Sequence, residues 1–288
     1  MPSVLATHLD AFVEANDVDA GVARDPLRFP KRYHTEGDVE VSAAFAATLA
    51  FGRVALFGPI IERALAIADR HGGPASFADS AARRDEGTLD GLQYRWLRSR
   101  DLFRLFQIFG RARQDHGSLA ALFTPGTAET TLAGAMASLG KLLPDDASPG
   151  LRSCFATPAG GSACKRWCMF LRWMVRRAPP DLGRWTHLSP ANLVIPLDTH
   201  VFRVATFLGL TSRAAPGWRT AVEITQALRT FDPDDPVKYD FALAHLGISG
   251  ACLGTRSPIV CPGCALNPVC LAPAPPADED ARPRQAKG

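Results

Sequence analysis

The sequence lacks a membrane span, a secretory leader and a large excess of one charge. The stretch from Val41 to Ile61 is the only candidate for a span, but Ser42, Thr48 and Arg53 interrupt it. We interpret it as part of a soluble core. The opening residues, "MPSVLATHLDAFVEAND", mix charged and apolar side chains, unlike a signal peptide. We therefore expect a cytoplasmic protein that does not enter the membrane.

The charge balance leaves the class of partner open. Lysine and arginine number 32 and aspartate and glutamate 29, a mildly basic balance that permits a nucleic-acid partner without requiring one. With 288 residues and 47% hydrophobic content, the chain is long enough to bury one substantial core or two modest ones.

Alternating, strand-like runs are nearly absent, and helical periodicity takes their place. Apolar residues recur at intervals of three and four, which predicts an all-α fold. The clearest such segments are "EVSAAFAATLAFG", "PIIERALAIADRHGG", "YRWLRSRDLFRLFQIFGRAR", "TTLAGAMASLGKLL", "CKRWCMFLRWMVRR", "VFRVATFLGL", "AVEITQALRTF" and "PVKYDFALAHLGI". Gly72, Gly73, Gly110 and Gly209 stand where helix stop signals are expected. Residues 273–288 have almost no large apolar side chain, and we expect a disordered tail there.

Four of the seven cysteines are gathered near the end of the chain. "CLGTRSPIVCPGCALNPVC" places Cys252, Cys261, Cys264 and Cys270 with eight, two and five residues between them. Cysteines of a cytosolic protein are poor disulfide candidates, so this grouping indicates a metal centre. One CxxC flanked by two single cysteines favours a [4Fe-4S] cluster. Zinc is the alternative metal, and four incidental buried cysteines are the alternative to any metal.

Asp198, in "ANLVIPLDTHVFRVATFLGL", precedes an amphipathic segment and has two interpretations. As a helix N-cap it accepts a backbone N–H before the apolar stripe that begins at Val201. A capping carboxylate can also do chemistry, because the helix start fixes its position and favours its charge. The local pattern alone leaves both open.

The order of these motifs resembles that of the DNA glycosylases with a helix-hairpin-helix, a superfamily typified by endonuclease III. The likeness is carried by Pro196 to Val204, by "AVEITQALRTFDPDDPVKYDFALAHLGISGAC" and by the four-cysteine loop. "VEVSAAFAATLAFGRV" is similar to the first core helix of the superfamily, with Phe51, Gly52 and Arg53 where many members have a glutamine that enters the duplex. The chain is also similar to uncharacterised bacterial proteins with "FPKRYH"-like and "SACKRxxMFLRWMVR"-like blocks.

This resemblance implies a two-lobed helical fold. It has a central helical domain over 37–185, with a hairpin-like motif, and a cluster domain made of 1–36 and 186–272. It also implies a nucleophilic lysine, for which the candidate is Lys165, 33 residues before the catalytic Asp198. Such a loop length costs little, so the two groups can still meet. The alternative is a lysine that touches phosphates from a basic stretch.

The same resemblance implies a function in base-excision repair. The substrate would be double-stranded DNA with a damaged base, and the activity that of an N-glycosylase and AP lyase, in a monomer associated with the nucleoid. The expected DNA contacts are Arg256, Lys238, Arg53 and Arg166. Tyr94, Arg95 and Trp96 either line the base pocket, insert into DNA or belong to the core.

Two other functions stay open at this point. One is a non-catalytic module that binds DNA or RNA through shape and phosphate contacts. The other is a regulatory protein stabilised by zinc.

Overall fold

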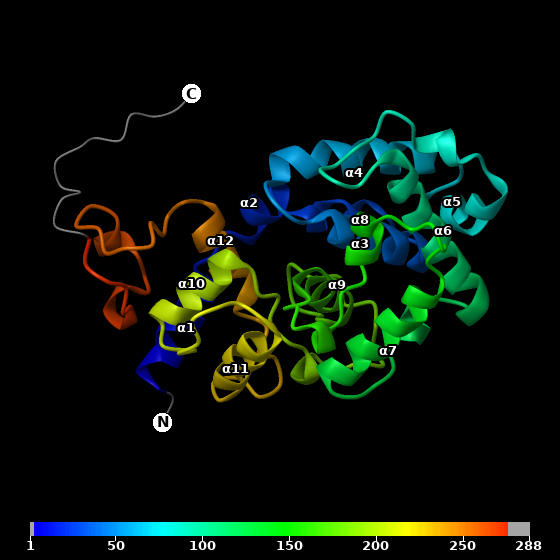
Figure 1. Ribbon diagram of the computed structural model, residues 1–288. Helices are drawn as coiled ribbons and strands as arrows, with labels where there is room; N and C mark the ends of the chain where they lie inside the picture. The colour runs from blue at the N-terminus through cyan, green and yellow to red at the C-terminus, as the bar shows by residue number, and fades with distance from the viewer. Residues whose placement is uncertain (1–2, 276–288) are drawn as a thin grey trace.

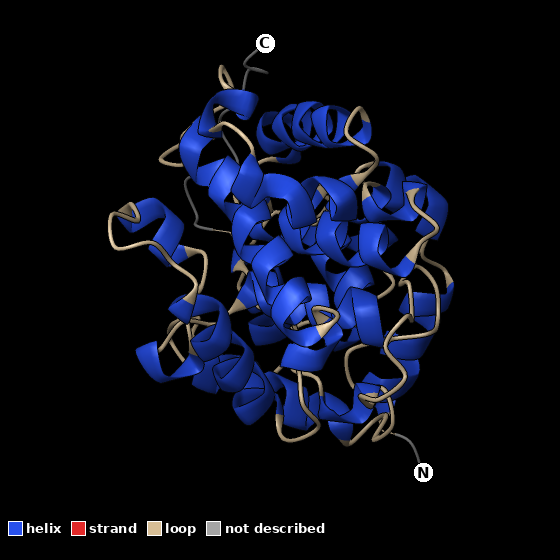
Figure 2. Ribbon diagram, turned by 90° about the vertical axis from the view of Figure 1, so that its right-hand side faces the viewer, coloured by secondary structure: helices blue, strands red, loops and turns tan. Residues whose placement is uncertain are grey.

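The fold, taken from a computed structural model that describes residues 3–275, consists of helices and loops. Within that range there is no β-strand, and one isolated bridge joins Tyr94 to Leu97 (Figure 2). The predicted all-α class is confirmed. The greater part of the predicted tail, residues 276–288, lies outside the described residues.

Residues 3–275 form twelve α-helices joined by short turns and 3₁₀ helices. They are α1 (Val4–Glu14), α2 (Val18–Ala23), α3 (Glu36–Leu49), α4 (Val54–Asp69), α5 (Pro74–Ser80), α6 (Ser99–His116), α7 (Ala128–Lys141), α8 (Pro149–Ser153), α9 (Lys165–Val175), α10 (Thr199–Phe207), α11 (Trp218–Arg229) and α12 (Asp240–Ile248).

Helix α3 lies in the hydrophobic core of the described protein. Every residue from Val39 to Leu49 is buried, and the run of alanines lets neighbouring helices approach closely. It packs against α5 and α9, and Phe45 stacks on Phe106 of α6 with ring centroids 4.5 Å apart. Figure 1 shows α4, α5, α6 and α7 on one side of the molecule, with α9 towards its middle.

Gly110 was predicted to stop a helix, and this prediction is wrong. Helix α6 continues through it to His116, because the missing side chain serves packing instead. A Cβ at position 110 would lie 2.0 Å from the carbonyl oxygen of Ala78 in α5. The glycine therefore lets two helix backbones touch. Gly209, in contrast, follows the end of α10 with φ 69°, as predicted for a stop signal.

The predicted helix that starts at Tyr94 is also shorter than expected. Tyr94 to Leu97 form a tight turn in which the two residues exchange backbone hydrogen bonds of 2.9 Å. Arg95 has φ 52°, a left-handed conformation that no α-helix contains. Helix α6 starts only at Ser99, where the Asp101 carboxylate accepts the Arg98 N–H at 3.0 Å.

The two ends of the described chain lie together. Helix α1 lies with α10, α11 and α12 in Figure 1. Asp10 of α1 accepts a hydrogen bond from the Tyr239 hydroxyl and forms an ion pair with Lys238, each at 3.0 Å. The neighbouring Leu9 is fully buried. The predicted domain boundaries at 36 and 185 remain a prediction.

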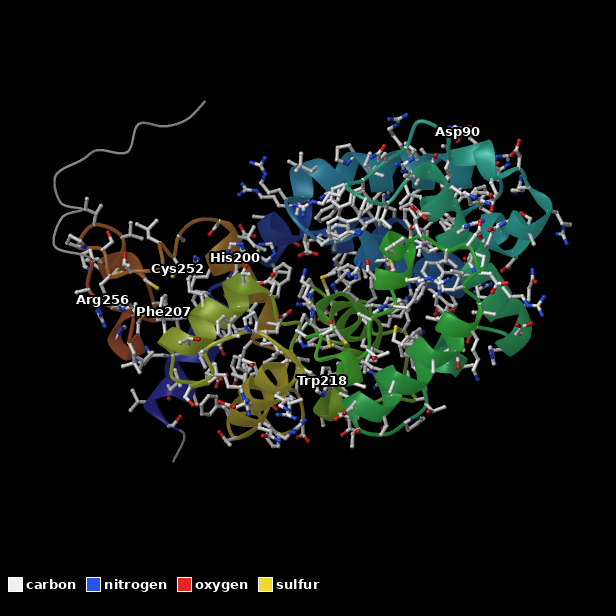
Figure 3. All side chains as sticks on the ribbon, in the orientation of Figure 1. Asp90, His200, Phe207, Trp218, Cys252 and Arg256 are labelled. Carbon is white, nitrogen blue, oxygen red and sulfur yellow. The ribbon has the colours of Figure 1, made fainter. Side chains whose placement is uncertain are left out.

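The four-cysteine loop follows α12. Between Cys252 and Cys270 its only regular structure is two 3₁₀ turns, Cys261–Gly263 and Asn267–Val269. In Figure 3, Arg256 of this loop lies towards the edge of the molecule and His200 nearer its middle. No helix within 3–275 has the length and apolar character needed to cross a membrane.

Candidate functional site

Asp198 occupies the N-cap of α10, as one of the two interpretations predicted. The buried segment from Leu193 to Leu197 leads the chain to this point. One carboxylate oxygen, Oδ1, accepts the backbone N–H groups of both His200 and Val201 at 2.9 Å. The other oxygen, Oδ2, accepts no hydrogen bond from residues 3–275. Capping therefore fixes the carboxylate through one oxygen and leaves the second available.

Lys165 is the first residue of α9, so its backbone is also fixed at a helix start. The chain enters α9 through Cys164, whose φ of 48° is left-handed. The half-buried Lys165 side chain crosses the end of α3, where Nζ donates to the carbonyl oxygen of Ala50 at 3.4 Å. Packing of α9 against α3 therefore aims the amine past the last turn of α3.

Lys165 and Asp198 line the same two adjoining pockets. We call them the outer pocket, of about 590 Å³, and the inner pocket, of about 480 Å³. Their shared wall consists of Ala50, Gly52, Arg53, Lys165, Asp198 and His200. The amine and the carboxylate, 33 residues apart in sequence, thus face one cleft.

A buried ion-pair network supports this cleft from the inside. Arg172 lies two helical turns beyond Lys165 on α9. Its guanidinium bonds Asp240 of α12 and Asp181 at the same time. Burial raises the pKa of Asp240 to about 6, Arg172 opposes the rise, and the charge of Asp198 adds to it. The charge of Lys165 lowers the same pKa, so Lys165 and Asp198 both lie within electrostatic reach of Asp240.

The inner pocket continues past the network to a second pair of ionisable groups. Asp25 Oδ2 lies 3.4 Å from Nε2 of His245, whose ring packs on Phe241 at 4.2 Å between centroids. Burial by itself would raise the pKa of Asp25. The contact with His245, the charge of Arg172 and the N–H of Leu27 outweigh burial and lower it.

Asp25, Arg172, Asp240 and His245 were not predicted as site residues. All but Asp25 lie in segments that periodicity predicted as helical. The one local signal was a charged residue inside an apolar run, Asp240 in "KYDFALAHL" and Arg172 in "MFLRWMV". Their convergence depends on the packing of α9 beside α12 and on the N-terminal segment, which no local pattern specifies.

The predicted aromatic candidates line neither pocket. Tyr94 is buried, and its hydroxyl donates to the carbonyl oxygen of Phe51. Trp96 is 53% exposed and stacks on Phe51, with centroids 5.0 Å apart. The guanidinium of Arg95 lies 5.6 Å from the Phe51 ring. Phe51, which all three candidates contact, does line the outer pocket.

The predicted DNA contacts have different surroundings. Arg53 and Arg166 line the outer pocket, and Arg166 donates to the carbonyl oxygens of Thr48 and Ser153. Lys238 is paired with Asp10 and Asp232 on the side of α1. Arg256 donates to Asn267 and to the Cys270 carbonyl oxygen within its own loop. The two arginines at the outer pocket are thus the nearest to the cleft.

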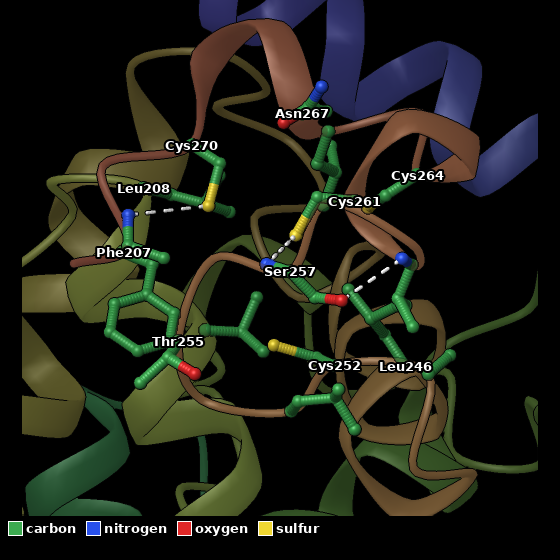
Figure 4. A pocket seen from close by; sticks show the side chains of 16 residues that line it. Phe207, Leu208, Leu246, Cys252, Thr255, Ser257, Cys261, Cys264, Asn267 and Cys270 are labelled. Atoms are coloured by element: carbon green, nitrogen blue, oxygen red, sulfur yellow. Dashed lines mark hydrogen bonds between the residues drawn. The ribbon is translucent and has the colours of Figure 1, made fainter. Parts of the chain in front are cut away.

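The four clustered cysteines surround one small apolar pocket of about 40 Å³, shown in Figure 4. Two of their sulfurs accept backbone N–H groups, Cys261 from Ser257 at 3.2 Å and Cys270 from Ala272 at 3.5 Å. Four sulfur donors, an apolar lining and N–H groups directed at sulfur suit an iron-sulfur cluster. Within 3–275, however, no three His, Cys, Asp or Glu side chains are close enough together to hold one metal ion.

The other cysteines, Cys154, Cys164 and Cys168, are buried and far from this loop in sequence. Burial raises the pKa of the Cys154 and Cys164 thiols to about 11. These buried thiols are therefore protonated and pack in the core.

Comparison with known proteins gives a family without an assigned activity. A family model described as "Protein of unknown function (DUF2400)" matches residues 25–249. The matched span includes Asp25, Lys165, Asp198 and Asp240 and ends just before Cys252. No curated protein matches the chain.

Proposed function

Because the chain belongs to the DUF2400 family, whose description names no activity, we propose a function from the site itself: a DNA glycosylase with AP lyase activity that removes a damaged base. The observation that supports this proposal is the shared wall of the two pockets, where Lys165 and Asp198 face one cleft. An amine beside a carboxylate is the pair of groups that such chemistry needs.

The reaction begins with a base rotated out of the duplex, since C1′ of the sugar cannot be reached inside the stack. The neutral form of the Lys165 amine attacks C1′ with its lone pair, while the Asp198 carboxylate, whose Oδ2 holds no hydrogen bond in the described protein, stabilises the positive charge that develops on the sugar. The bond between C1′ and the base breaks, and the base departs with the bonding electrons. Once the C1′–N bond has formed, Asp198 accepts a proton from the nitrogen, and this proton passes to the departing base.

The resulting adduct opens to a Schiff base between Lys165 and the sugar. Loss of a proton from C2′ then expels the 3′ phosphate by β-elimination and nicks the strand. Water finally releases Lys165 from the sugar fragment. These reaction steps consume no oxidant or reductant, so they need no redox centre.

The proposed role of the cysteine loop is structural. Cys252, Cys261, Cys264 and Cys270 would hold a [4Fe-4S] cluster, which would supply a fixed scaffold for the loop. Arg256 would be held on the loop surface near DNA phosphates. We expect the protein to act as a monomer on double-stranded DNA in the nucleoid. Iron and zinc are distinguished by anaerobic purification, which gives a brown protein with iron or a colourless one with zinc.

Borohydride trapping tests the lyase. The native protein is incubated with labelled duplexes that each carry one lesion, and borohydride reduces any Schiff base to a stable adduct. We expect an adduct with the native protein and none with Lys165→Ala. Lys141→Ala is the matched control, since Lys141 is an exposed lysine at the end of α7.

Two results contradict the lyase: no adduct from any lesion, or an undiminished adduct from Lys165→Ala. Base release without trapping would leave a glycosylase that uses water and Asp198. If DNA binds but no base is released, and Asp198→Asn binds equally well, the protein is a non-catalytic nucleic-acid-binding module.

A further inference from the structure

The inner pocket has a part that the outer pocket does not share. That part lies beyond Lys165 and Asp198 and is walled by apolar side chains such as Phe57, Met169 and Phe241. The whole pocket, about 480 Å³, has the size of a typical small-molecule site. A flat, largely apolar ligand attached near Lys165 would extend into this part.

Two carboxylates with open acceptor positions line this part, and the first is Asp25. The Asp25 side chain is 14% exposed, and its pKa is lowered as described above, so the carboxylate is ionised at neutral pH. Its Oδ1 accepts the Leu27 N–H at 2.8 Å, whereas Oδ2 has only the 3.4 Å contact with His245. Ordinary hydrogen bonds to oxygen measure roughly 2.7–3.2 Å, so Oδ2 retains capacity to accept.

Asp240 adds a second acceptor with an open position. The residue lines the inner pocket and is 3% exposed, and its Oδ2 receives the guanidinium of Arg172. Its Oδ1 is buried and has no hydrogen-bond partner in the described protein. A buried oxygen without a partner is costly and rare in native proteins. A donor from a ligand would satisfy it after a small rotation of the carboxyl group.

The buried donor of this part, Arg172, is already engaged, since it directs Nε and Nη2 to Asp181 and Nη1 to Asp240. Arg24 also lines this part, but it is exposed to solvent. The unshared part of the inner pocket therefore presents carboxylate oxygens to a ligand, and it favours a ligand that brings its own N–H groups.

We propose that the inner pocket receives the flipped base and that Asp25 and Asp240 select bases that keep an exocyclic amino group. This inference rests on the proposed function for the presence of a flipped base. Cytosine, adenine and guanine carry such an amino group, whereas uracil, thymine and hypoxanthine carry a carbonyl oxygen in its place. A carbonyl oxygen facing these carboxylates would leave them without a donor and would repel them.

Pairs of lesions that differ only in the amino group provide the test. One pair is 5-hydroxycytosine and 5-hydroxyuracil, and a second is an oxidised guanine and the same lesion without its 2-amino group. A 2′-fluorine on the lesion nucleotide destabilises a positive sugar and prevents base release. Duplexes built this way report affinity alone, independently of catalysis.

We expect the native protein to bind the amino member of at least one pair about 10- to 100-fold more tightly, the effect of one unpaired buried acceptor. In Asp25→Asn and in Asp240→Asn an amide replaces an acceptor, and the ratio should fall to within a few-fold of one. Asp79→Asn on α5, whose exposed side chain pairs with Arg113 of α6 and lines neither pocket, should keep the native ratio. The ratio cancels any uniform gain in DNA affinity from the lost charge.

Equal affinity for both members of both pairs, or tighter binding of the member without the amino group, overturns the inference. A native preference that both folded variants retain also overturns the assignment to Asp25 and Asp240. The fate of the proposed function is read separately on cleavable duplexes. Base release without amino preference refutes this inference alone, and amino preference without base release refutes only the glycosylase.

Discussion

The cleft around Lys165 and Asp198 and the loop that carries the four cysteines are held in place in different ways. In the cleft, both side chains start a helix, and packing of α9 against buried α3 and of α10 against α12 fixes those helices. In the loop there are two 3₁₀ turns, and apolar side chains such as Ile259, 88% exposed, face outward. The protein chain alone therefore positions the first site, whereas the second relies on few contacts of its own.

The proposed function gives a reason for this difference. Helix ends and buried ion pairs are stable without a ligand, so a catalytic pair mounted on them would be in position before DNA binds. Four cysteines separated by prolines and glycines would gain their order from the proposed metal centre, because metal binding and folding of the ligands are one event.

Replacing a clustered cysteine should abolish the order of the four-cysteine loop and leave the rest of the fold unchanged. We expect Cys261→Ser to lose the bound iron and the loop over 250–272 to be cut about tenfold faster or more by protease, as local unfolding is no longer opposed. Iron analysis and limited proteolysis measure both. Cys168→Ala, a buried cysteine of α9, should keep its iron. Iron retained in Cys261→Ser would contradict the ligand assignment.

Replacing Asp198 should separate its two roles in the cleft. Asparagine caps helices as well as aspartate, so Asp198→Asn should keep its unfolding free energy within a few tenths of a kcal/mol. Base release in a single turnover should still slow by about 10²- to 10⁴-fold, the usual contribution of a general base.

Asp198→Ala extends the same comparison. It should lose the rate and also about 1 kcal/mol of stability, because the N–H groups of His200 and Val201 lose their acceptor. Denaturant melts and rates on the two variants decide the matter. A fully active Asp198→Asn would reduce Asp198 to a cap.

Asp240 gives the cleft a pH dependence. Burial raises its pKa to about 6 against about 3.9 in the unfolded chain, so between these values only the folded protein holds the proton. The contribution of Asp240 to the free energy of unfolding should therefore fall by about 2–3 kcal/mol as pH rises from about 4 to 7. Asp240→Asn cannot titrate. The difference in unfolding free energy between the native protein and this variant should follow that curve, and a difference independent of pH would refute it.

The smallest effect concerns the link between α10 and α12. A Cβ at Gly247 would lie 2.5 Å from the Cβ of His200, so Gly247→Ala should cost about 1 kcal/mol despite the better helix propensity of alanine. The matched control is Gly134→Ala on α7, where no atom lies within 4 Å. That change should stabilise the protein by about 0.5–1 kcal/mol. Equal shifts in melting temperature for the two variants would show that α12 can move freely beside α10.

The sequence predicted the local features of the fold better than the distant ones. Periodicity predicted the helices that became α9 and α10, and a short polar side chain before an apolar stripe predicted the Asp198 cap. Gly110 misled the analysis because a glycine that ends a helix and one that admits a neighbouring helix look alike in sequence. The turn at Tyr94 was missed because the left-handed Arg95 has no local signature.

The candidate site divides in the same way. Lys165 and Asp198 were identified through a family resemblance, and their common cleft is a feature of the fold. Asp25 and Asp240 were missed because their surroundings depend on contacts between distant segments, 220 residues apart for Asp25 and His245 and 68 residues apart for Asp240 and Arg172. Burial and pKa follow from such contacts, which periodicity and spacing do not encode.

The pairing of Asp10 with Lys238 and Tyr239 has a consequence for biosynthesis. Helix α1 leaves the ribosome before Lys238 and Tyr239, which follow it by more than 220 residues. At roughly 5–20 residues per second, this delay lasts on the order of 10–50 s. Throughout that interval Asp10 lacks these two partners, so α1 completes its docking only after the chain has been made as far as Tyr239.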